Sequence, residues 1–262
     1  MAVDSPLKKL YLFVLAALLL VLSGCGTLPT KTEELGHFSP DPEYGHDQLI
    51  KHAGFHLGYS YRHRQALWVS YELLGDDLEK PQFTRADKFA PDPQISTDPV
   101  QPKEYARTGF DRGHLAPAAD MSYSQPTLLE SFYMSNISPQ KPGCNRGIWK
   151  KLETQVREWA REKRRIFVVT GPMFSDQPTR MGSGRIPVPE AFYKVLFTPD
   201  EPREMIGFII PNCDDDRPLK FFALPVDDIE QRTRLDFFGG LADELENRLE
   251  SRINYRFWFP SY

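Results

Sequence analysis

Three short apolar runs in the second half of the chain restrict the fold more than any other feature of the sequence. Ile166–Thr170, Phe192–Phe197 and Met205–Ile210 are rich in β-branched and aromatic residues, and each is followed within two residues by a proline. Short apolar runs of this composition predict buried β-strands, which proline tends to end. We therefore expect the first of these strands to stop at Gly171-Pro172.

Further elements follow from the spacing of apolar residues. A repeat near 3.6 residues predicts an amphipathic helix, and two apolar segments around a polar turn predict a hairpin. Strands and helices follow one another without regular alternation, which favours an α+β fold over a doubly wound sheet. The expected elements are a helix over residues 145–163, a late helix through Leu241, Leu245 and Leu249, a short helix over Leu128–Met134, and a hairpin of Tyr59–Tyr61 with Leu67–Leu73.

Length and composition limit the number of domains and the kinds of partner. The chain has 262 residues, of which 40% are hydrophobic, and no repeat or second linker interrupts the sequence after His46. This length suits one large domain, which we place at residues 46–262. The formal charge is −4, and without residues 1–25 it is −5, because 30 Lys and Arg then face 35 Asp and Glu. An anionic partner must therefore be bound by a local basic site.

The N-terminus has the pattern of an export signal. Lys8 and Lys9 precede an apolar run, Leu10–Leu22, and small residues follow it. The run has about 13 residues, fewer than the roughly 20 that a helix needs to span a bilayer. Residues 22–25, Leu-Ser-Gly-Cys, resemble a bacterial lipobox. This resemblance implies that Cys25 is diacylated and becomes the first residue after cleavage. A plain signal peptide with an incidental cysteine and an uncleaved anchor are the alternatives.

The segment after Cys25 predicts how the domain is attached. Residues 26–45 contain Thr, Pro, Gly and Glu with little apolar periodicity, which is typical of a tether. Gly26, where an Asp would favour the inner membrane, makes the outer membrane our expectation, with the domain facing the periplasm or the cell surface. In such an oxidising compartment Cys144 and Cys213 can form a disulfide. Two separate buried thiols are the other possibility.

The segment Asp111–Pro117 carries the clearest chemical signal. Arg112 and His114 lie two residues apart, so on an extended segment their side chains point to the same face. A guanidinium binds phosphate oxygens, and an imidazole can take a proton from water near neutral pH. The pair therefore suits cleavage of a phosphodiester bond.

Asn145 and Glu153 predict a metal site. They are eight residues apart, which on a continuous helix places them within about 80° of each other. One amide oxygen and a more distant carboxylate form a metal site with few protein oxygen ligands. Mg²⁺ suits such a site because it retains several waters and needs few protein ligands.

These motifs together resemble the DNA/RNA non-specific endonuclease family, which includes mitochondrial endonuclease G and secreted bacterial nucleases. The likeness covers most of residues 55–260. The family implies the ββα-metal (His-Me finger) fold, in which a histidine on a strand faces a metal ligand on a helix beside a central, mostly antiparallel sheet flanked by helices. The segments that carry the likeness are Asp111–Pro117, Phe132–Gln140, Asn145–Glu153 and Val169–Phe174.

The resemblance also implies roles for individual residues. His114 is the general base that activates water, and Asn145 is the one direct protein ligand of Mg²⁺, for which Mn²⁺ is a possible substitute. The remaining implied roles are charge stabilisation on the phosphate by Arg112, orientation of a water held by the metal by Glu153, ordering of the site by Asp111, and phosphate binding by Arg85, which rests on the short pattern Thr84–Phe89.

The implied activity is hydrolysis of DNA and RNA to 5′-phosphate ends. Contacts confined to phosphates carry no sequence information, so we expect little base preference. One alternative is a catalytically silent lipoprotein that binds extracellular nucleic acid. Another is an envelope lipoprotein with a structural or partner-binding role. We interpret Asn136 and Gln140 as residues whose hydrogen bonds order a loop.

Overall fold

The structure is a computed structural model that describes residues 39–40, 45–80, 82–84 and 88–260. The expected signal peptide with Cys25, most of the expected tether and Arg85 lie outside the described residues. Within the described ranges, no helix combines the length and the apolar character that crossing a membrane would require.

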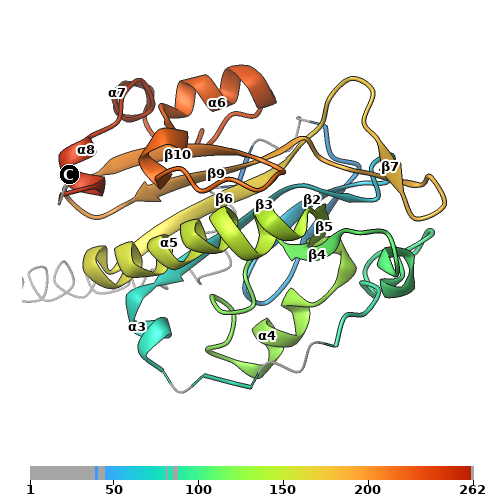
Figure 1. The fold of residues 1–262 in the computed structure, drawn as a ribbon. Coiled ribbons are helices and arrows are strands. Elements are labelled where there is room, and N and C mark those ends of the chain that lie inside the picture. The colour runs from blue at the N-terminus through green and yellow to red at the C-terminus, as the bar shows by residue number, and fades with distance from the viewer. Residues whose placement is uncertain (1–38, 41–44, 81, 85–87, 261–262) are drawn as a thin grey trace, which may run out of the picture. The chain divides into compact units, whose positions relative to one another are not determined.

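A seven-stranded sheet forms the centre of the fold (Figure 1). Its strand order is β1-β2-β3-β6-β9-β10-β11, and each neighbouring pair is antiparallel. The expected hairpin is β2–β3, and the three apolar runs lie in β6, β9 and β10, so these predictions are confirmed. The strands are β1 (Gln48–Lys51), β2 (His56–Ser60), β3 (Gln65–Leu74), β6 (Arg165–Met173), β9 (Ala191–Thr198), β10 (Glu204–Pro211) and β11 (Ala223–Leu224).

Strand β6 is longer than the sequence predicts. It continues through Gly171 and Pro172 to Met173, so the expected stop at Gly171-Pro172 is wrong. The pairing of β6 with β3 ends at Thr170, and beyond that point β6 pairs only with β9. Proline is tolerated where a strand has one neighbour, because there is no second ladder for its missing N–H to interrupt.

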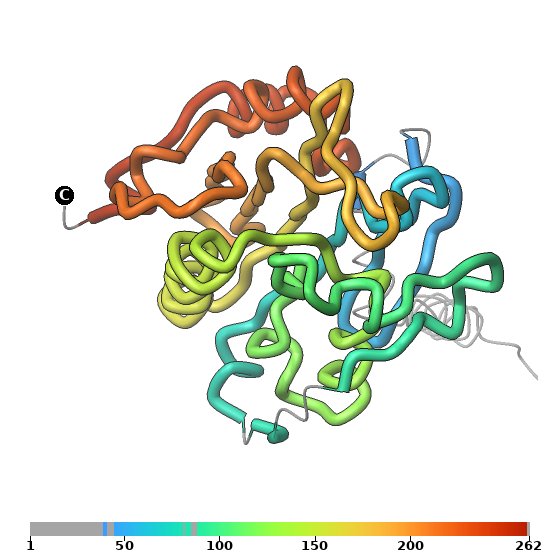
Figure 2. Tube along the Cα trace, turned by 45° about the vertical axis from the view of Figure 1, so that its right-hand side comes forward, coloured from blue at the N-terminus to red at the C-terminus, as the bar shows by residue number. Residues whose placement is uncertain are grey.

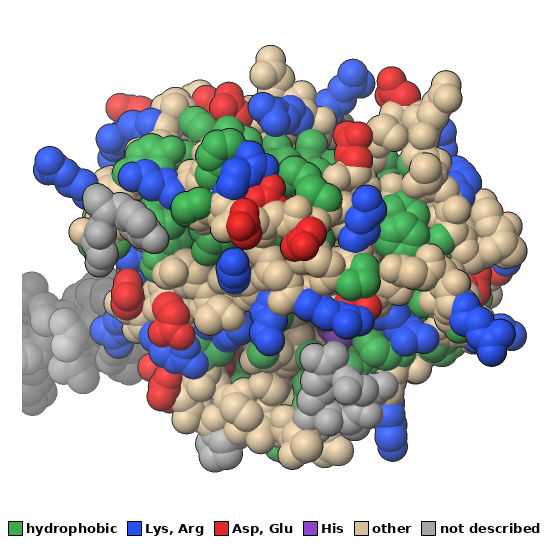
Figure 3. Space-filling view, viewed as in Figure 1, with side chains coloured by type: hydrophobic (Ala, Val, Ile, Leu, Met, Phe, Trp, Pro, Cys, Tyr) green, Lys and Arg blue, Asp and Glu red, His purple; other side chains and the backbone are tan. Residues whose placement is uncertain are grey.

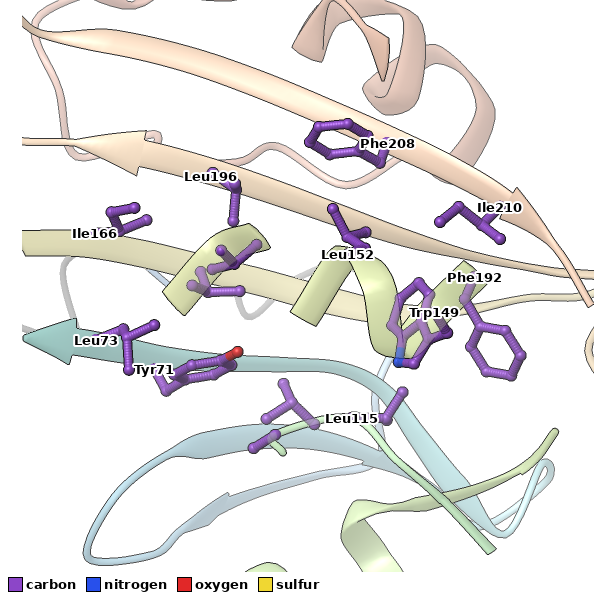
Figure 4. Packing of buried hydrophobic residues seen from close by; sticks show 14 of the residues in the cluster. Tyr71, Leu73, Leu115, Trp149, Leu152, Ile166, Phe192, Leu196, Phe208 and Ile210 are labelled. Carbon is purple, nitrogen blue, oxygen red and sulfur yellow. The ribbon is translucent and has the colours of Figure 1, made fainter. Parts of the chain in front are cut away.

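Alternating side chains of the sheet build two apolar cores. Phe192 and Leu196 of β9 face the core beneath helix α5 (Trp149–Lys163), whereas Val195 faces the core beneath α6 (Val226–Thr233) and α7 (Asp243–Glu250). The sheet is therefore covered on both faces, and Figure 4 shows the first core. Burying each large apolar side chain contributes about 1.5–3 kcal/mol.

Two helices begin elsewhere than the sequence predicts. The regular part of the expected 145–163 helix begins at Trp149, and Cys144–Ile148 form a wide turn, η3, before it. Helix α4 covers Gln125–Ser131 rather than Leu128–Met134, because the Ser124 hydroxyl caps it by accepting the Thr127 N–H at 3.3 Å.

Short elements complete the fold, and a two-stranded ribbon of β4 and β5 lies beside the main sheet. Figure 2 shows from a second direction that the C-terminal segment, in red, and the region of this ribbon, in green, lie apart. These elements together make an α+β architecture, as predicted. The remaining bounds are α3 (Gly75–Glu79), η1 (Pro102–Tyr105), β4 (Asp111–His114), η2 (Met134–Asn136), β5 (Ile137–Gln140), β7 (Arg180–Met181), β8 (Ile186–Pro187), η4 (Leu219–Phe222) and α8 (Tyr255–Trp258).

Candidate active site

The ribbon β4–β5 and helix α5 form a strand–strand–helix unit that holds most of the predicted site residues. In the antiparallel register Asp111 faces Gln140 and His114 faces Ile137. The ribbon is tight at Gly113, where an added Cβ would lie 2.2 Å from Oε1 of Gln140. Because β5 leads directly into η3 and α5, this unit places His114 on a strand and Asn145 at the start of the helical segment.

Asp111 connects the ribbon to the start of the helical segment. Its carboxylate accepts a hydrogen bond from Nδ2 of Asn145 at 2.9 Å and two from the Arg146 guanidinium at 2.7 and 2.6 Å. Partial burial raises the pKa of Asp111, but the bonds from Arg146 and Asn145 outweigh this effect and lower it overall. Asp111 is therefore a fixed, charged acceptor, which suits an ordering role.

The bond to Asp111 also sets the orientation of the Asn145 amide. An ionised carboxylate can only accept hydrogen bonds, so the side of the amide that faces Asp111 must be the NH₂ group. Oδ1 of Asn145 then points away from Asp111 and remains available as a neutral oxygen ligand. This donor chemistry fits Mg²⁺ or another hard divalent cation.

The expected geometry of Asn145 and Glu153 on one continuous helix is wrong. Gly147 has φ −102° and ψ −111°, outside the helical region, so a kink lies within η3, between Asn145 and the start of α5. Asn145 belongs to the wide turn before the kink, and Glu153 belongs to the regular helix after it.

Arg112 and His114 share one face of β4, as the alternation of strand side chains requires. Both lie against Phe89: its ring centre is 5.2 Å from the Arg112 guanidinium carbon and 5.5 Å from the His114 ring centre. Phe132 contacts the His114 ring edge-on at 5.0 Å, and Nη2 of Arg112 donates to the Pro102 carbonyl at 2.8 Å. These contacts hold a cation and an imidazole side by side.

Asn136 orders the chain immediately after His114, as predicted. Its Oδ1 accepts the Ala116 N–H at 2.9 Å, and its Nδ2 donates to the carbonyls of Ala116 and Ser131 at 2.9 and 2.8 Å. The same prediction for Gln140 is wrong, because its buried amide atoms have no hydrogen-bond partner among the described residues. Gln140 instead packs against Gly113.

Glu153, which is half-buried, belongs to a group of charges between α5 and the sheet. Burial raises the pKa of Glu153 to about 7, against the attraction of Lys194. Burial also lowers the pKa of Lys194 to about 8. Asp120 completes the group by accepting bonds from Arg157 and from the Tyr71 hydroxyl, each at 2.9 Å.

Sequence reasoning missed Lys194, Asp120 and Tyr71. Lys194 is fully buried, and its Nζ lies 4.9 Å from the Trp149 ring centre. The available signal was that Lys194 is the one charged residue inside the apolar run Phe192–Phe197. The negative charge of Glu153 opposes the effect of burial on the pKa of Lys194, but Nζ of Lys194 has no hydrogen-bond partner among the described residues.

The cysteines form no disulfide in the structure, and of the two thiols only Cys144 is buried, whereas Cys213 is half-buried. Cys144 and Cys213 are both free thiols. Burial raises the pKa of the Cys144 thiol to about 12, and the neighbouring Cys213 adds to this effect. Both residues lie close to the turn that carries Asn145.

A shallow groove beside η3 and α5 is lined by several cations. It has a volume of about 540 Å³, and its basic residues are Arg146, Lys150, Lys151 and Arg217. Figure 3 shows Lys and Arg side chains across the middle of this face of the molecule. The protein has a formal charge of −4, so an anionic partner requires a local basic site, and this group of cations is a candidate for it.

Comparison with known proteins identifies the family. The model of the DNA/RNA non-specific endonucleases matches residues 38–244, so this chain belongs to that family, as the motifs indicate. The chain is therefore an endonuclease of a class that acts on nucleic acids with a divalent metal.

Individual relatives agree with this assignment. Nuclease C1 of Cunninghamella echinulata var. echinulata is 34% identical over 220 residues, which cover 77% of this chain and 86% of that protein. Mitochondrial endonuclease G of Bos taurus is 32% identical over 205 residues, 72% of this chain and 69% of that protein. A chain in the crystal structure of an EndoG/EndoGI complex has a TM-score of 0.74 at 28% identity and covers 82% of this chain and 94% of its own length.

Proposed function

We propose that the protein is a Mg²⁺-dependent endonuclease that cleaves DNA and RNA without sequence preference and is anchored by lipid to the cell envelope. The observation that carries the catalytic part is the hydrogen bond from Asn145 to Asp111, which joins the strand bearing His114 to the turn bearing the metal ligand. The same bond leaves Oδ1 of Asn145 free for a cation.

In this proposal Asn145 holds the metal ion. When bound, Mg²⁺ neutralises negative charge that develops on the phosphate and on the leaving oxygen. Mn²⁺ is a possible substitute, because it also prefers oxygen ligands. Asp111 positions the Asn145 amide, and its own charge is matched by Arg146.

His114 acts as the general base. It takes a proton from a water molecule whose oxygen forms the new bond to phosphorus, while the bond from phosphorus to the 3′-oxygen breaks. The products carry 5′-phosphate ends. The reaction needs no 2′-hydroxyl, so both DNA and RNA are substrates.

The other predicted residues support the phosphate and the water. Arg112, held by Phe89 and by the Pro102 carbonyl, stabilises charge on the scissile phosphate. Arg85 contributes a second phosphate contact, and Glu153 orients water at the metal. The groove cations bind neighbouring phosphates, which carry no sequence information.

The test is digestion of circular single-stranded DNA, duplex DNA and RNA by the purified full-length chain, with Mg²⁺ or with EDTA. Wild type should cut all three substrates only with metal. His114→Ala should lose at least about a hundredfold in rate, the lower end of what general-base catalysis contributes. Asn145→Ala, which removes the proposed metal ligand, should lose most of its Mg²⁺-dependent activity. The matched controls His63→Ala and Asn247→Ala should retain activity.

Two results would contradict the catalytic proposal. One is wild-type protein that leaves every substrate intact with Mg²⁺. The other is His114→Ala cutting as fast as wild type. If wild type and His114→Ala retained DNA equally without cutting it, the silent nucleic-acid-binding lipoprotein would replace the enzyme. A chain that retained no nucleic acid at low salt would instead favour a structural envelope lipoprotein.

The anchor is tested separately. We propose that residues 1–25 are a lipoprotein signal peptide, that Cys25 is acylated, and that residues 26–45 are the tether to the outer membrane. In cells, Cys25→Ser should move the protein from the membrane fraction to the soluble fraction or block its processing, while the nuclease assay on the isolated protein stays unchanged. Wild-type protein that fractionates as soluble would refute the anchor and leave the enzymatic proposal intact.

A further inference from the structure

A cluster of five carboxylates lies between α6 and α7, on the opposite face of the sheet from α5. Asp227 and Glu230 come from α6, Asp236 from the connecting segment, and Glu246 and Glu250 from α7. Carboxylate oxygens of Asp227, Glu230 and Glu250 all lie within 4.8 Å of one another. The three range from exposed at Asp227 to buried at Glu250.

The buried end of this cluster lacks the partners that buried carboxylates need. Glu250 is only 5% exposed, and its Oε1 has no hydrogen-bond partner. Oε1 of Glu246 is also buried without a partner. Glu230 accepts one backbone bond, from the N–H of Phe237 at 2.7 Å. A buried carboxylate oxygen without a donor is costly unless a cation approaches it.

The three carboxylates that lie within 4.8 Å of one another have no basic partner among the described residues. Among the described residues, no Lys, Arg or His forms an ion pair with Asp227, Glu230 or Glu250. Burial, reinforced by repulsion from the neighbouring carboxylates, raises the pKa of Glu250 to about 9 and that of Glu230 to about 7. A bound divalent cation would relieve this repulsion between the carboxylates.

We propose that Asp227, Glu230 and Glu250 bind one Ca²⁺ ion that ties α7 to α6. The ligand set consists of oxygen atoms only, which selects a hard cation. Ca²⁺ is coordinated by six to eight oxygen atoms, which come from monodentate or bidentate carboxylates and from water. Exposed Asp227 leaves room for water, and Glu250 supplies the unpartnered buried oxygen. Mg²⁺ needs a stricter octahedral geometry, which three clustered carboxylates suit less well.

The proposed ion stabilises the layer of helices over the second core. Leu249, next to Glu250, packs in this core with Val226 and Ile229 of α6. Holding the two helices together therefore protects the apolar residues beneath them. This site is separate from Asn145, which lies with α5 on the other face of the sheet, so the inference does not depend on the proposed catalytic metal.

The test is thermal unfolding and equilibrium dialysis of the full-length chain at pH 8 after removal of metal. All proteins carry Asn145→Ala, which removes the proposed catalytic ligand. This background should bind one Ca²⁺ per chain, with a saturable rise in Tm of about 5 °C or more once Ca²⁺ exceeds its Kd about a hundredfold. Adding Glu250→Gln should abolish both effects, and its metal-free Tm should equal or exceed that of the background.

Glu244→Gln is the matched control, because Glu244 is an exposed acid on the same helix. It should leave Ca²⁺ binding unchanged. If Glu250→Gln does not fold, Asp227→Asn is the variant that tests the proposal. It should raise the Ca²⁺ concentration for half-maximal binding about tenfold or more. Absence of saturable Ca²⁺ binding, an equal Tm rise in Glu250→Gln, or Mg²⁺ acting at lower concentration than Ca²⁺ would overturn the proposal.

Discussion

Replacing Asn136 by Asp changes one NH₂ group to an oxygen and leaves the size of the side chain almost unchanged. In the native protein that NH₂ group donates to two buried carbonyls, at Ala116 and Ser131, and the side-chain oxygen accepts the Ala116 N–H. Asn136 itself is fully buried. In Asn136→Asp the acceptor is retained, both donors are lost, and a negative oxygen faces two carbonyl oxygens.

The cost follows from these contacts. Each buried carbonyl left without a donor costs about 1–3 kcal/mol. Two carbonyls with added repulsion should reduce the free energy of unfolding by about 3–5 kcal/mol at pH 8. Asn136→Ala, which leaves room for water, should cost less. Because Ala116 follows His114 by two residues, the rate of plasmid cleavage should also fall in Asn136→Asp.

The loss of stability in Asn136→Asp should be larger at high pH than at low pH. Only the protonated form of the new carboxyl can donate to a carbonyl, so folding raises its pKa above the unfolded value of about 3.9. The penalty is therefore largest at pH 8 and shrinks as the pH falls toward the unfolded value. Urea unfolding followed by tryptophan fluorescence at pH 8 and pH 5 measures both quantities.

The exposed variant Asn247→Asp is the control and should change stability by less than about 0.5 kcal/mol. If Asn136→Asp lay within about 1 kcal/mol of wild type at pH 8, or if its penalty were equal at both pH values, the role assigned to these hydrogen bonds would be refuted.

Three further changes test the site. Gly113→Ala places a Cβ 2.2 Å from Oε1 of Gln140, so it should cost about 1–3 kcal/mol in urea unfolding and most of the cleavage activity. Lys194→Met removes the cation that opposes the raised pKa of Glu153. That pKa should rise further above 7, and the acidic limb of the pH–rate profile, where activity is lost as pH falls, should move to higher pH. Asp111→Asn should change stability by less than about 1 kcal/mol because Arg146, its partner in the ion pair, is 71% exposed. It should, however, raise the Mg²⁺ concentration for half-maximal cleavage about 10–100-fold, as loss of a group that orients a metal ligand does.

Exposed residues of the same types provide the controls. Lys103→Met should leave the pH–rate profile in place, and Asp243→Asn should leave the Mg²⁺ requirement unchanged. The assignments would be contradicted by wild-type cleavage in Gly113→Ala, an unmoved acidic limb in Lys194→Met, or an unchanged Mg²⁺ requirement in Asp111→Asn.

Local patterns in the sequence predict much of the fold because the central strands carry their own signal. The apolar runs in β6, β9 and β10 need no knowledge of their neighbours to be recognised as buried. The end of β6 was predicted wrongly because it depends on where β3 stops pairing, at Thr170, and that position is a tertiary property. The start of α5 was predicted wrongly because Gly147 interrupts an otherwise continuous helical pattern.

In the candidate active site, too, features set by neighbouring residues could be predicted, whereas contacts between residues distant in the sequence could not. The spacing of Arg112 and His114 predicts a shared face, and strand geometry alone makes that prediction sound. The bond between Asp111 and Asn145 joins residues 34 positions apart, and no periodicity indicates it. The electrostatic interaction of Lys194 with Glu153 likewise depends on the packing of α5 against β9.

Two glutamates on opposite faces of the sheet, Glu153 and Glu250, differ in the charges that surround them. Burial raises the pKa of both Glu153 and Glu250. For Glu153, Lys194 and Arg157 oppose the rise, and the pKa stays at about 7. For Glu250 every principal neighbour is another carboxylate, and the pKa reaches about 9. The group around Glu153 contains its own cations. The principal neighbours of Glu250 include no cation, so its charge is neutralised either by a proton or by the proposed Ca²⁺. Because the sheet separates the two groups, neither can neutralise the other.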